Sequence, residues 1–379
     1  MQNWKYGNDM KIKILFFIHD MGHGGAEKVL ANLVNNMDYE KYDISIIALF
    51  KGGVNEQFLN KEIKYKTIFP KMIPANSKIM KLFSPYFLHK LFIKEEYNIE
   101  VAYLEGPDAR IISGCRNKHT KTVFWVHCFM HDSKEFAGAF RNFKEATRCY
   151  GDFDAGAFVS EEVKTAFNVY NNTAQNRVVL YNTNDTEIIV KKSKEKIEKK
   201  AEDVFQIIAI GKIEIIKGFD RLARIHKKLI DEGYRIRTIV LGEGTQKEQI
   251  QKYVRDNHIT ESFKFLGYKT NPYKYIAQSN LFVCSSYSEG FSTATTEALI
   301  LGIPVVTTQV SGMREMLGGN NEYGLITDNS DEALFRGIKK MLDDKNLYLS
   351  YKEKAKMRGK FFEKSNMVRS TEKFLESLL

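Results

Sequence analysis

The most informative segment of the chain is Ser285-Ser-Tyr-Ser-Glu289-Gly-Phe-Ser-Thr-Ala-Thr-Thr-Glu297-Ala-Leu-Ile-Leu-Gly302-Ile-Pro-Val-Val-Thr-Thr308. The apolar run 281–284 just before it predicts a short buried strand. Residues 292–301 are typical of a helix, and 304–307 of the next strand. The chain therefore contains a strand–loop–helix–strand unit with two glutamates eight positions apart.

The entrance of this helix is a candidate anion site. Free backbone N–H groups and the positive end of the helix dipole favour a phosphate at the positions Gly290, Phe291, Ser292 and Thr293. Glu289 precedes these amides, and Glu297 reaches the same crevice from one turn further along. Carboxylates beside an anion site favour a ligand that carries both hydroxyls and phosphate, such as a sugar nucleotide. The alternative is that Glu289 caps the helix and that Glu297 is solvated.

Length and composition indicate a globular protein of two domains. The chain has 379 residues, which is long for one core, and 43% of them are hydrophobic. Neither an apolar run of membrane-span length nor a secretory signal pattern is recognisable, so we expect a cytoplasmic protein. The four cysteines are far apart in the sequence, which suits reduced thiols: Cys115, Cys128, Cys149 and Cys284.

The formal net charge of +10 favours polyanionic partners. No nucleic-acid-binding motif accompanies it, so we expect no nucleic acid partner. Residues 71–94 mix lysines with large apolar side chains. This pattern is compatible with peripheral contact with an anionic membrane, and equally with a solvated helix pair whose apolar side is core.

The first half of the chain alternates predicted strands and helices. A strand at 13–18 is followed by a glycine-rich turn with Gly22, Gly24 and Gly25, and then by an amphipathic helix. Such a turn lets the backbone approach a phosphate or sugar, although the G-x-G-x-x-G order is missing. Further strands are predicted at 43–49, 99–104, 122–127 and 155–160, which indicates a parallel sheet. Met10 stands immediately before the first strand and is a candidate start.

His127 ends the strand 122–127, so its side chain should emerge at the carboxyl edge of the sheet, where open α/β folds bind ligands. The neighbours Cys128, His131 and Asp132 fit no standard zinc spacing. Asp152-Phe-Asp154 precedes the strand 155–160, and we interpret it as a turn and strand entrance. We therefore predict no metal site.

The second half begins after the charged run from Lys191 to Lys200, which we interpret as a linker. A strand at 205–210 restarts the alternation, and Lys212 and Lys217 follow at its carboxyl edge. Two ammonium groups there can neutralise a diphosphate that gains charge as its sugar departs.

Together these motifs resemble the retaining glycosyltransferases of family 4, also known as glycosyl transferases group 1 and here of the bacterial surface-polysaccharide type. The resemblance rests on Glu289-Gly-Phe-Ser…Glu297-Ala…Gly302-x-Pro-Val-Val, on the Gly24-Gly25-Ala-Glu27 loop and on Lys217-Gly-Phe-Asp. Lys212 stands where the family more often has arginine. The family adopts the α/β GT-B fold, two facing Rossmann-like domains with a cleft between them. The resemblance implies domains at 1–190 and 191–366, and a final helix, 367–379, that returns to the first.

The resemblance also implies a metal-independent enzyme that moves a sugar from a nucleotide-diphosphate sugar, expected to be a UDP-sugar, to a polysaccharide, lipid-linked or protein-linked glycan, with no cofactor. Catalytic roles fall to His127, Glu289 and Lys217. Donor contacts fall to Gly24, Gly25, Lys212, Lys217, Glu289, Gly290, Phe291, Ser292, Thr293 and Glu297. The alternatives are another GT-B enzyme, such as a sugar-nucleotide epimerase or a phosphorylase, and a non-catalytic partner subunit. Location in the cytoplasm, peripheral at the inner face of the plasma membrane, is expected.

Overall fold

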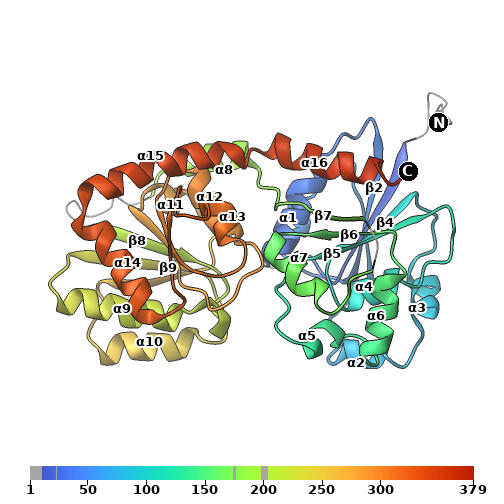
Figure 1. Ribbon diagram of the computed structural model, residues 1–379, viewed down its shortest axis with the longest axis horizontal. Helices are drawn as coiled ribbons and strands as arrows, with labels where there is room; N and C mark the ends of the chain where they lie inside the picture. The colour runs from blue at the N-terminus through green and yellow to red at the C-terminus, as the bar shows by residue number, and fades with distance from the viewer. Residues whose placement is uncertain (1–10, 23, 174–175, 198–203) are drawn as a thin grey trace. The chain divides into compact units, whose positions relative to one another are not determined.

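The computed structural model describes residues 11–22, 24–173, 176–197 and 204–379. The candidate start Met10 and His23 of the glycine-rich turn lie outside this part of the chain. The chain folds into two compact units, Met1–Thr183 with Met367–Leu379, and Asn184–Asn366. Figure 1 shows a parallel sheet with accompanying helices in each unit.

The first unit is built on a seven-stranded sheet in the order β3-β2-β1-β4-β5-β6-β7, and every pairing is parallel. The strand order reverses between β1 and β4. In open parallel sheets such a reversal marks the ligand-binding edge. The strands are β1 (Ile12–Ile18), β2 (Tyr42–Phe50), β3 (Lys64–Phe69), β4 (Ile99–Ala102), β5 (Lys121–Val126), β6 (Ala155–Phe158) and β7 (Asn176–Val179).

Helices connect these strands, and α16 adds the C-terminal segment to the same unit. Glu372 and Glu376 of α16 accept hydrogen bonds from the Asp38 backbone N–H at 2.9 Å and from the Tyr42 hydroxyl at 2.6 Å. The helices are α1 (Gly25–Val34), η1 (Glu56–Phe58), α2 (Asn76–Met80), α3 (Pro85–Phe92), α4 (Pro107–Ile112), α5 (Ser133–Ala137), α6 (Phe143–Gly151), α7 (Glu161–Asn168) and α16 (Lys364–Glu376).

The predicted strands of this unit are confirmed because long apolar runs mark strands buried on both faces. Residues 14–18 of β1 are all fully buried. The edge strand β3 was not predicted, since its residues alternate lysine with apolar or hydroxyl side chains and are half-exposed. Asp154 accepts hydrogen bonds from the backbone N–H of Thr122 at 2.8 Å and from its hydroxyl at 3.1 Å, which confirms it as a strand entrance before β6.

The second unit carries a six-stranded parallel sheet in the order β10-β9-β8-β11-β12-β13, with its reversal between β8 and β11. Its strands are β8 (Phe205–Ile210), β9 (Ile236–Leu241), β10 (Phe263–Gly267), β11 (Leu281–Cys284), β12 (Val305–Thr308) and β13 (Leu325–Thr327). Its helices are α8 (Thr186–Ser193), η2 (Ile215–Lys217), α9 (Phe219–Asp231), α10 (Lys247–Asp256), α11 (Tyr273–Ala277), α12 (Thr293–Ile300), α13 (Met313–Leu317), α14 (Asp331–Asp343) and α15 (Lys345–Phe361).

The interpretation of Lys191–Lys200 as a linker is wrong for its first residues, which belong to α8. The Asp185 carboxylate caps this helix by accepting the Ile188 N–H at 3.0 Å, and the Ile189 side chain is buried. Lysines in the last turn suit the negative end of the helix dipole. Residues 198–200 lie outside the described residues, and the division of the chain falls at Thr183/Asn184 rather than after residue 190.

Residues 71–94 form the predicted helix pair, α2 and α3. Met80, Leu88 and Phe92 are buried beneath it. The outer face is also apolar and bears these exposed side chains: Met72, Ile79, Leu82, Phe83, Tyr86, Phe87 and Leu91. Among the described residues, none of the helices combines the length and the apolar character needed to span a bilayer.

Candidate active site

In the second unit, two loops at the strand-order reversal meet at an ion pair. The Lys217 ammonium donates to both oxygens of the Glu289 carboxylate, at 2.7 Å and 2.6 Å. The side chain of Glu289 is only 8% exposed and that of Lys217 is 26% exposed. The Ser286 hydroxyl donates to the same carboxylate at 2.6 Å. Glu289 therefore does not cap the following helix; it fixes the ammonium group at the carboxyl edge of the sheet.

The backbone of the two loops explains how Lys217 reaches Glu289. Gly218 has a left-handed φ of 62°, and a Cβ at this position would collide with the Ser285 carbonyl oxygen. The loops are joined by the Ser285 hydroxyl, which donates to the Lys217 carbonyl at 3.0 Å, and by the Tyr287 N–H, which donates to the Ile216 carbonyl at 2.7 Å. Only glycine fits this close approach.

Arg221, a buried residue of α9, stabilises the loop that follows β11. The Arg221 guanidinium stacks on the Tyr287 ring, 3.8 Å from its centroid, and binds Asn329 at 2.6 Å and Asp331 at 3.1 Å. The position of Glu289 is thus fixed from two sides, by the Gly218 turn and by Arg221.

The helix after this loop begins as predicted. Ser292 is the N-cap of α12, and its hydroxyl accepts the Thr295 N–H at 3.3 Å. Phe291 is buried, and Gly312 packs against it and against the Gly290 carbonyl in a left-handed conformation. The helix entrance is therefore confirmed as local structure, with Thr293 as its first residue.

Glu297 is not solvated, because it is only 2% exposed on α12. A buried carboxylate is expensive unless it has partners, so its burial favours a specific role over a surface position. Lys212, in contrast, is exposed just after β8, and no ion pair of its side chain is found within the described part of the chain. The structure brings Lys217 and Glu289 together and leaves Lys212 outside that contact.

In the first unit, His127 follows the end of β5, as the sequence predicts. Its ring packs against those of Tyr103 and Trp125, with centroids 4.7 Å and 5.9 Å away. Burial of the ring lowers the pKa of His127 to about 3, although a hydrogen bond with the Tyr103 backbone opposes this. The histidine is therefore neutral at physiological pH, and its Nε2 has no hydrogen-bond partner among the residues that the structure describes.

Two acidic residues near His127 were missed at the sequence level. The Glu105 carboxylate accepts the His127 backbone N–H at 2.9 Å, and burial raises its pKa. Asp108 is fully buried at the start of α4, and burial, with Glu105 and Asp20 nearby, raises its pKa well above the usual value. Both follow the strand 99–104, so the carboxyl-edge argument that selected His127 could have found them.

The glycine-rich turn lies after β1 in the same unit. Gly24 is the N-cap of α1 and Gly25 its first residue. A Cβ on Gly24 would collide with the carboxylate of Glu27, which folds back over the helix entrance. The Gly22 N–H donates to Asp20 at 2.7 Å. The turn is thus confirmed as the entrance of α1, with carboxylates held against it.

Residues 190–358 match the family Glycosyl transferases group 1. Over 377 residues, covering 96% of this chain and 99% of the relative, the chain is 28% identical to an N-acetylgalactosamine-N,N'-diacetylbacillosaminyl-diphospho-undecaprenol 4-alpha-N-acetylgalactosaminyltransferase of Campylobacter jejuni. It is 29% identical to the capsular polysaccharide biosynthesis glycosyltransferase CapM of Staphylococcus aureus over 161 residues, 41% of each chain.

Solved structures agree on the fold. The structure of Anabaena HepE in complex with UDP-glucose aligns with a TM-score of 0.78 at 17% identity, covering 97% of this chain and all of the other. A Rickettsia africae glycosyltransferase aligns with a TM-score of 0.73 at 16% identity, covering 97% of this chain and 98% of the other. The two parallel sheets, the family match and these alignments lead to one conclusion: the chain is a glycosyltransferase with the GT-B fold, and its residues 190–358 are similar to the glycosyl transferases group 1 family.

Proposed function

We propose that the protein is a retaining, metal-independent glycosyltransferase that moves a sugar from a UDP-sugar to a lipid-linked glycan in bacterial polysaccharide biosynthesis. The observation that carries this proposal is the ion pair between Lys217 and the buried carboxylate of Glu289 at the strand-order reversal of the second unit. It provides a fixed cation where open α/β sheets bind nucleotides.

The roles follow from charge and position. Lys217, held by Glu289, neutralises the diphosphate, and the entrance of α12 at Ser292 and Thr293 adds its backbone amides. Glu297 accepts the ribose hydroxyls from the same helix. Lys212 is exposed and serves the diphosphate as a mobile second charge. Gly24 and Gly25 let the backbone of the first unit approach the substrate.

Retention of anomeric configuration is supported by the electrostatics of His127. An inverting reaction needs a general base with a pKa near the working pH, and burial lowers the pKa of this histidine to about 3. We propose instead that the acceptor oxygen bonds to the anomeric carbon on the face that the diphosphate leaves. The carbon–oxygen bond to the β-phosphate breaks, and that phosphate oxygen takes the acceptor proton. Neutral His127 then binds the sugar through Nε2.

Independence from a divalent metal is supported by the same cationic groups. The negative charge that develops on the departing diphosphate is stabilised by Lys217 and by the positive end of the α12 dipole. These groups supply, at fixed positions, the stabilisation that a metal ion supplies in other sites. No cofactor is required for the transfer.

The acceptor class is supported by the Campylobacter relative, whose name describes transfer to a glycan on diphospho-undecaprenol. Such an acceptor is anchored in a membrane, so the enzyme should work at the inner face of the plasma membrane. Residues 71–94 suit that place, because they carry five lysines and no acidic residue. Exposed apolar side chains accompany them, with Leu82 77% and Met72 58% exposed.

A donor screen followed by a transfer assay tests the proposal. Nucleotide sugars, UDP-N-acetylhexosamines first, are ranked by the rise they cause in the thermal unfolding temperature. The best donor is then incubated with polyprenyl-diphosphate-linked oligosaccharides. We expect one UDP-sugar to stabilise the protein and its sugar to be transferred. Transfer to water or phosphate alone, or isomerisation of the donor, would contradict the proposal.

A further inference from the structure

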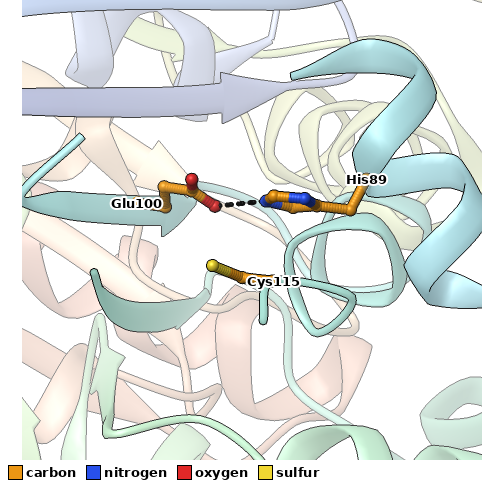
Figure 2. A group of neighbouring side chains, drawn as sticks. All are labelled: His89, Glu100 and Cys115. Carbon is orange, nitrogen blue, oxygen red and sulfur yellow. Dashed lines mark hydrogen bonds and ion pairs between the residues drawn. The ribbon is translucent and has the colours of Figure 1, made fainter. Parts of the chain in front are cut away.

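Three potential metal ligands converge in the first unit, away from the candidate active site. His89 on α3, Glu100 on β4 and Cys115, which follows α4, each offer one ligand atom, and these atoms lie within 4.8 Å of one another. The His89 Nε2 is 2.7 Å from Glu100 Oε2. Figure 2 shows the three side chains pointing toward one another from separate elements.

A close backbone contact brings the cysteine to this position. Gly114 precedes Cys115, and a Cβ on Gly114 would collide with the Pro85 carbonyl at the start of α3. The glycine therefore lets the end of α4 press against α3, and this places the thiol beside His89. The geometry depends on packing between segments that are far apart in sequence.

The trio lies toward the opposite edge of the sheet from His127. Glu100 pairs in register with Thr122, the second residue of β5, whereas His127 follows the last residue of that strand. The side chain of Glu100 is 3% exposed and that of His89 is 14% exposed. A buried carboxylate at this depth requires a positive partner.

We propose that His89, Glu100 and Cys115 bind one Zn²⁺ ion, which has a structural role. Imidazole nitrogen, carboxylate oxygen and thiolate sulfur are the ligand types that zinc prefers, and water completes its tetrahedron. One thiolate and one carboxylate balance the two positive charges, so a neutral cluster replaces the ion pair that Glu100 forms with protonated His89.

The distances need little change. Zinc–ligand bonds of about 2.0–2.3 Å place tetrahedral ligand atoms roughly 3.4–3.6 Å apart. The distance between His89 Nε2 and Glu100 Oε2 therefore increases by less than about 1 Å, and Cys115 Sγ stays within 4.8 Å of both atoms, as it is now.

Binding of zinc releases the thiol proton of Cys115 and any proton on His89 to solvent. Burial of the ring lowers the pKa of His89, but the hydrogen bonds with Cys115 and Glu100 have a larger combined effect and raise this pKa to about 9.

Zinc at this point would tie α3 to the sheet and to α4. Of these, α3 carries three of the seven exposed apolar side chains proposed to meet the membrane, and Leu88 and Phe92 already pack its inner side. The ion thus adds a cross-link beneath a helix of eight residues.

Metal content and cobalt spectroscopy test this proposal on the whole chain. Protein purified in the presence of Zn²⁺ and then dialysed should retain one zinc per chain. Replacement by Co²⁺ should give the ultraviolet thiolate-to-cobalt charge-transfer band. Cys115→Ser, a nearly isosteric change, should abolish the band and weaken Zn²⁺ binding by more than about tenfold. The exposed Cys128 provides the matched control, and Cys128→Ser should keep both the zinc and the band.

His89→Gln is the second variant, and circular dichroism shows whether each variant is folded. Absence of stoichiometric zinc in the wild-type protein, or an unchanged cobalt band in folded Cys115→Ser, would overturn the proposal. Loss of zinc from Cys128→Ser alone would also overturn it, because the metal would then lie beside His127.

Discussion

At the scale of single residues, the ion pair between Lys217 and Glu289 joins two motifs that are 72 positions apart in the chain. Each could be selected from the sequence as a candidate, but their contact could not. It depends on the left-handed Gly218 and on the Ser285 carbonyl that a side chain would strike. A candidate residue can thus be selected from its motif, while its partner is a property of the fold.

Replacing Lys217 by glutamine should lower kcat by about 10²–10³-fold, because a fixed charge beside the departing diphosphate is lost. Steady-state kinetics with the donor found in the screen measure this. Lys252→Gln on α10 removes a lysine that is 71% exposed and should leave kcat unchanged. A Lys217→Gln enzyme with wild-type kcat would remove this lysine from the mechanism.

Glu297→Gln should weaken binding of UDP by about 1.5–3 kcal/mol, because charge-assisted hydrogen bonds to the ribose become neutral ones. Isothermal titration calorimetry measures the affinity, and Glu353→Gln, on an exposed position of α15, is the control. Unchanged affinity in a folded Glu297→Gln variant would mean that the buried carboxylate has only a structural role.

At the scale of elements, α2 and α3 carry the surface proposed to meet the membrane. Replacing Lys78, Lys81 and Lys90 by glutamine should reduce binding to anionic vesicles, since each lysine near the surface contributes about 1 kcal/mol. Sedimentation with phosphatidylglycerol vesicles should show binding that falls as salt rises.

A matched triple variant distinguishes the contribution of the lysines on and beside α2 and α3 from that of the net charge of the protein. Replacing Lys252, Lys264 and Lys356 by glutamine removes the same three charges from the second unit and should leave vesicle binding intact. Equal loss in both triple variants would point to net charge alone, and no sedimentation at low salt would end the membrane proposal.

The packing of α9 on the second sheet includes a buried histidine. His226 makes hydrogen bonds with Thr238 and Ser262, both at 2.8 Å, and burial lowers its pKa to about 4. In the unfolded chain the pKa of His226 is about 6.5. Between that pH and pH 4, the imidazole is therefore protonated in the unfolded state but neutral in the folded state. Stability is therefore lost as pH falls from about 6.5 to 4, by on the order of 3 kcal/mol from this residue.

Urea unfolding of the wild-type protein and of His226→Gln, followed by far-ultraviolet circular dichroism at pH 7 and pH 4.5, tests this prediction. The variant is expected to be less stable at pH 7 and to lose less stability on acidification. Parallel pH dependences in the two proteins would show that the histidine is not buried in its neutral form.

At the scale of the whole molecule, much of the architecture could be predicted from the sequence. Continuous apolar runs marked the central strands such as β1 and β11, and the glycine-rich turn and the Ser292 cap marked helix entrances. The edge strand β3 escaped because its exposed lysines break the apolar pattern. The charged run after Lys191 resembled a linker because α8 buries little apart from Ile189.

The trio of His89, Glu100 and Cys115 could not be found from the sequence at all. Its residues follow no ligand spacing, and only the packing of α3 and the end of α4 on β4 brings them together. Sequence motifs therefore located the candidate active site, whereas a site assembled from three distant segments required the fold.

The most direct test of the proposed mechanism is the anomeric configuration of the product, determined by NMR and compared with that of the donor, with and without EDTA. We expect the same configuration in donor and product, formed at a similar rate in both conditions. Because EDTA could also remove zinc from the proposed structural site, the Cys115→Ser variant is assayed alongside. An inverted linkage, or activity that EDTA abolishes and manganese restores in both proteins, would contradict retention without a metal and would make Asp152 and Asp154 candidate metal ligands.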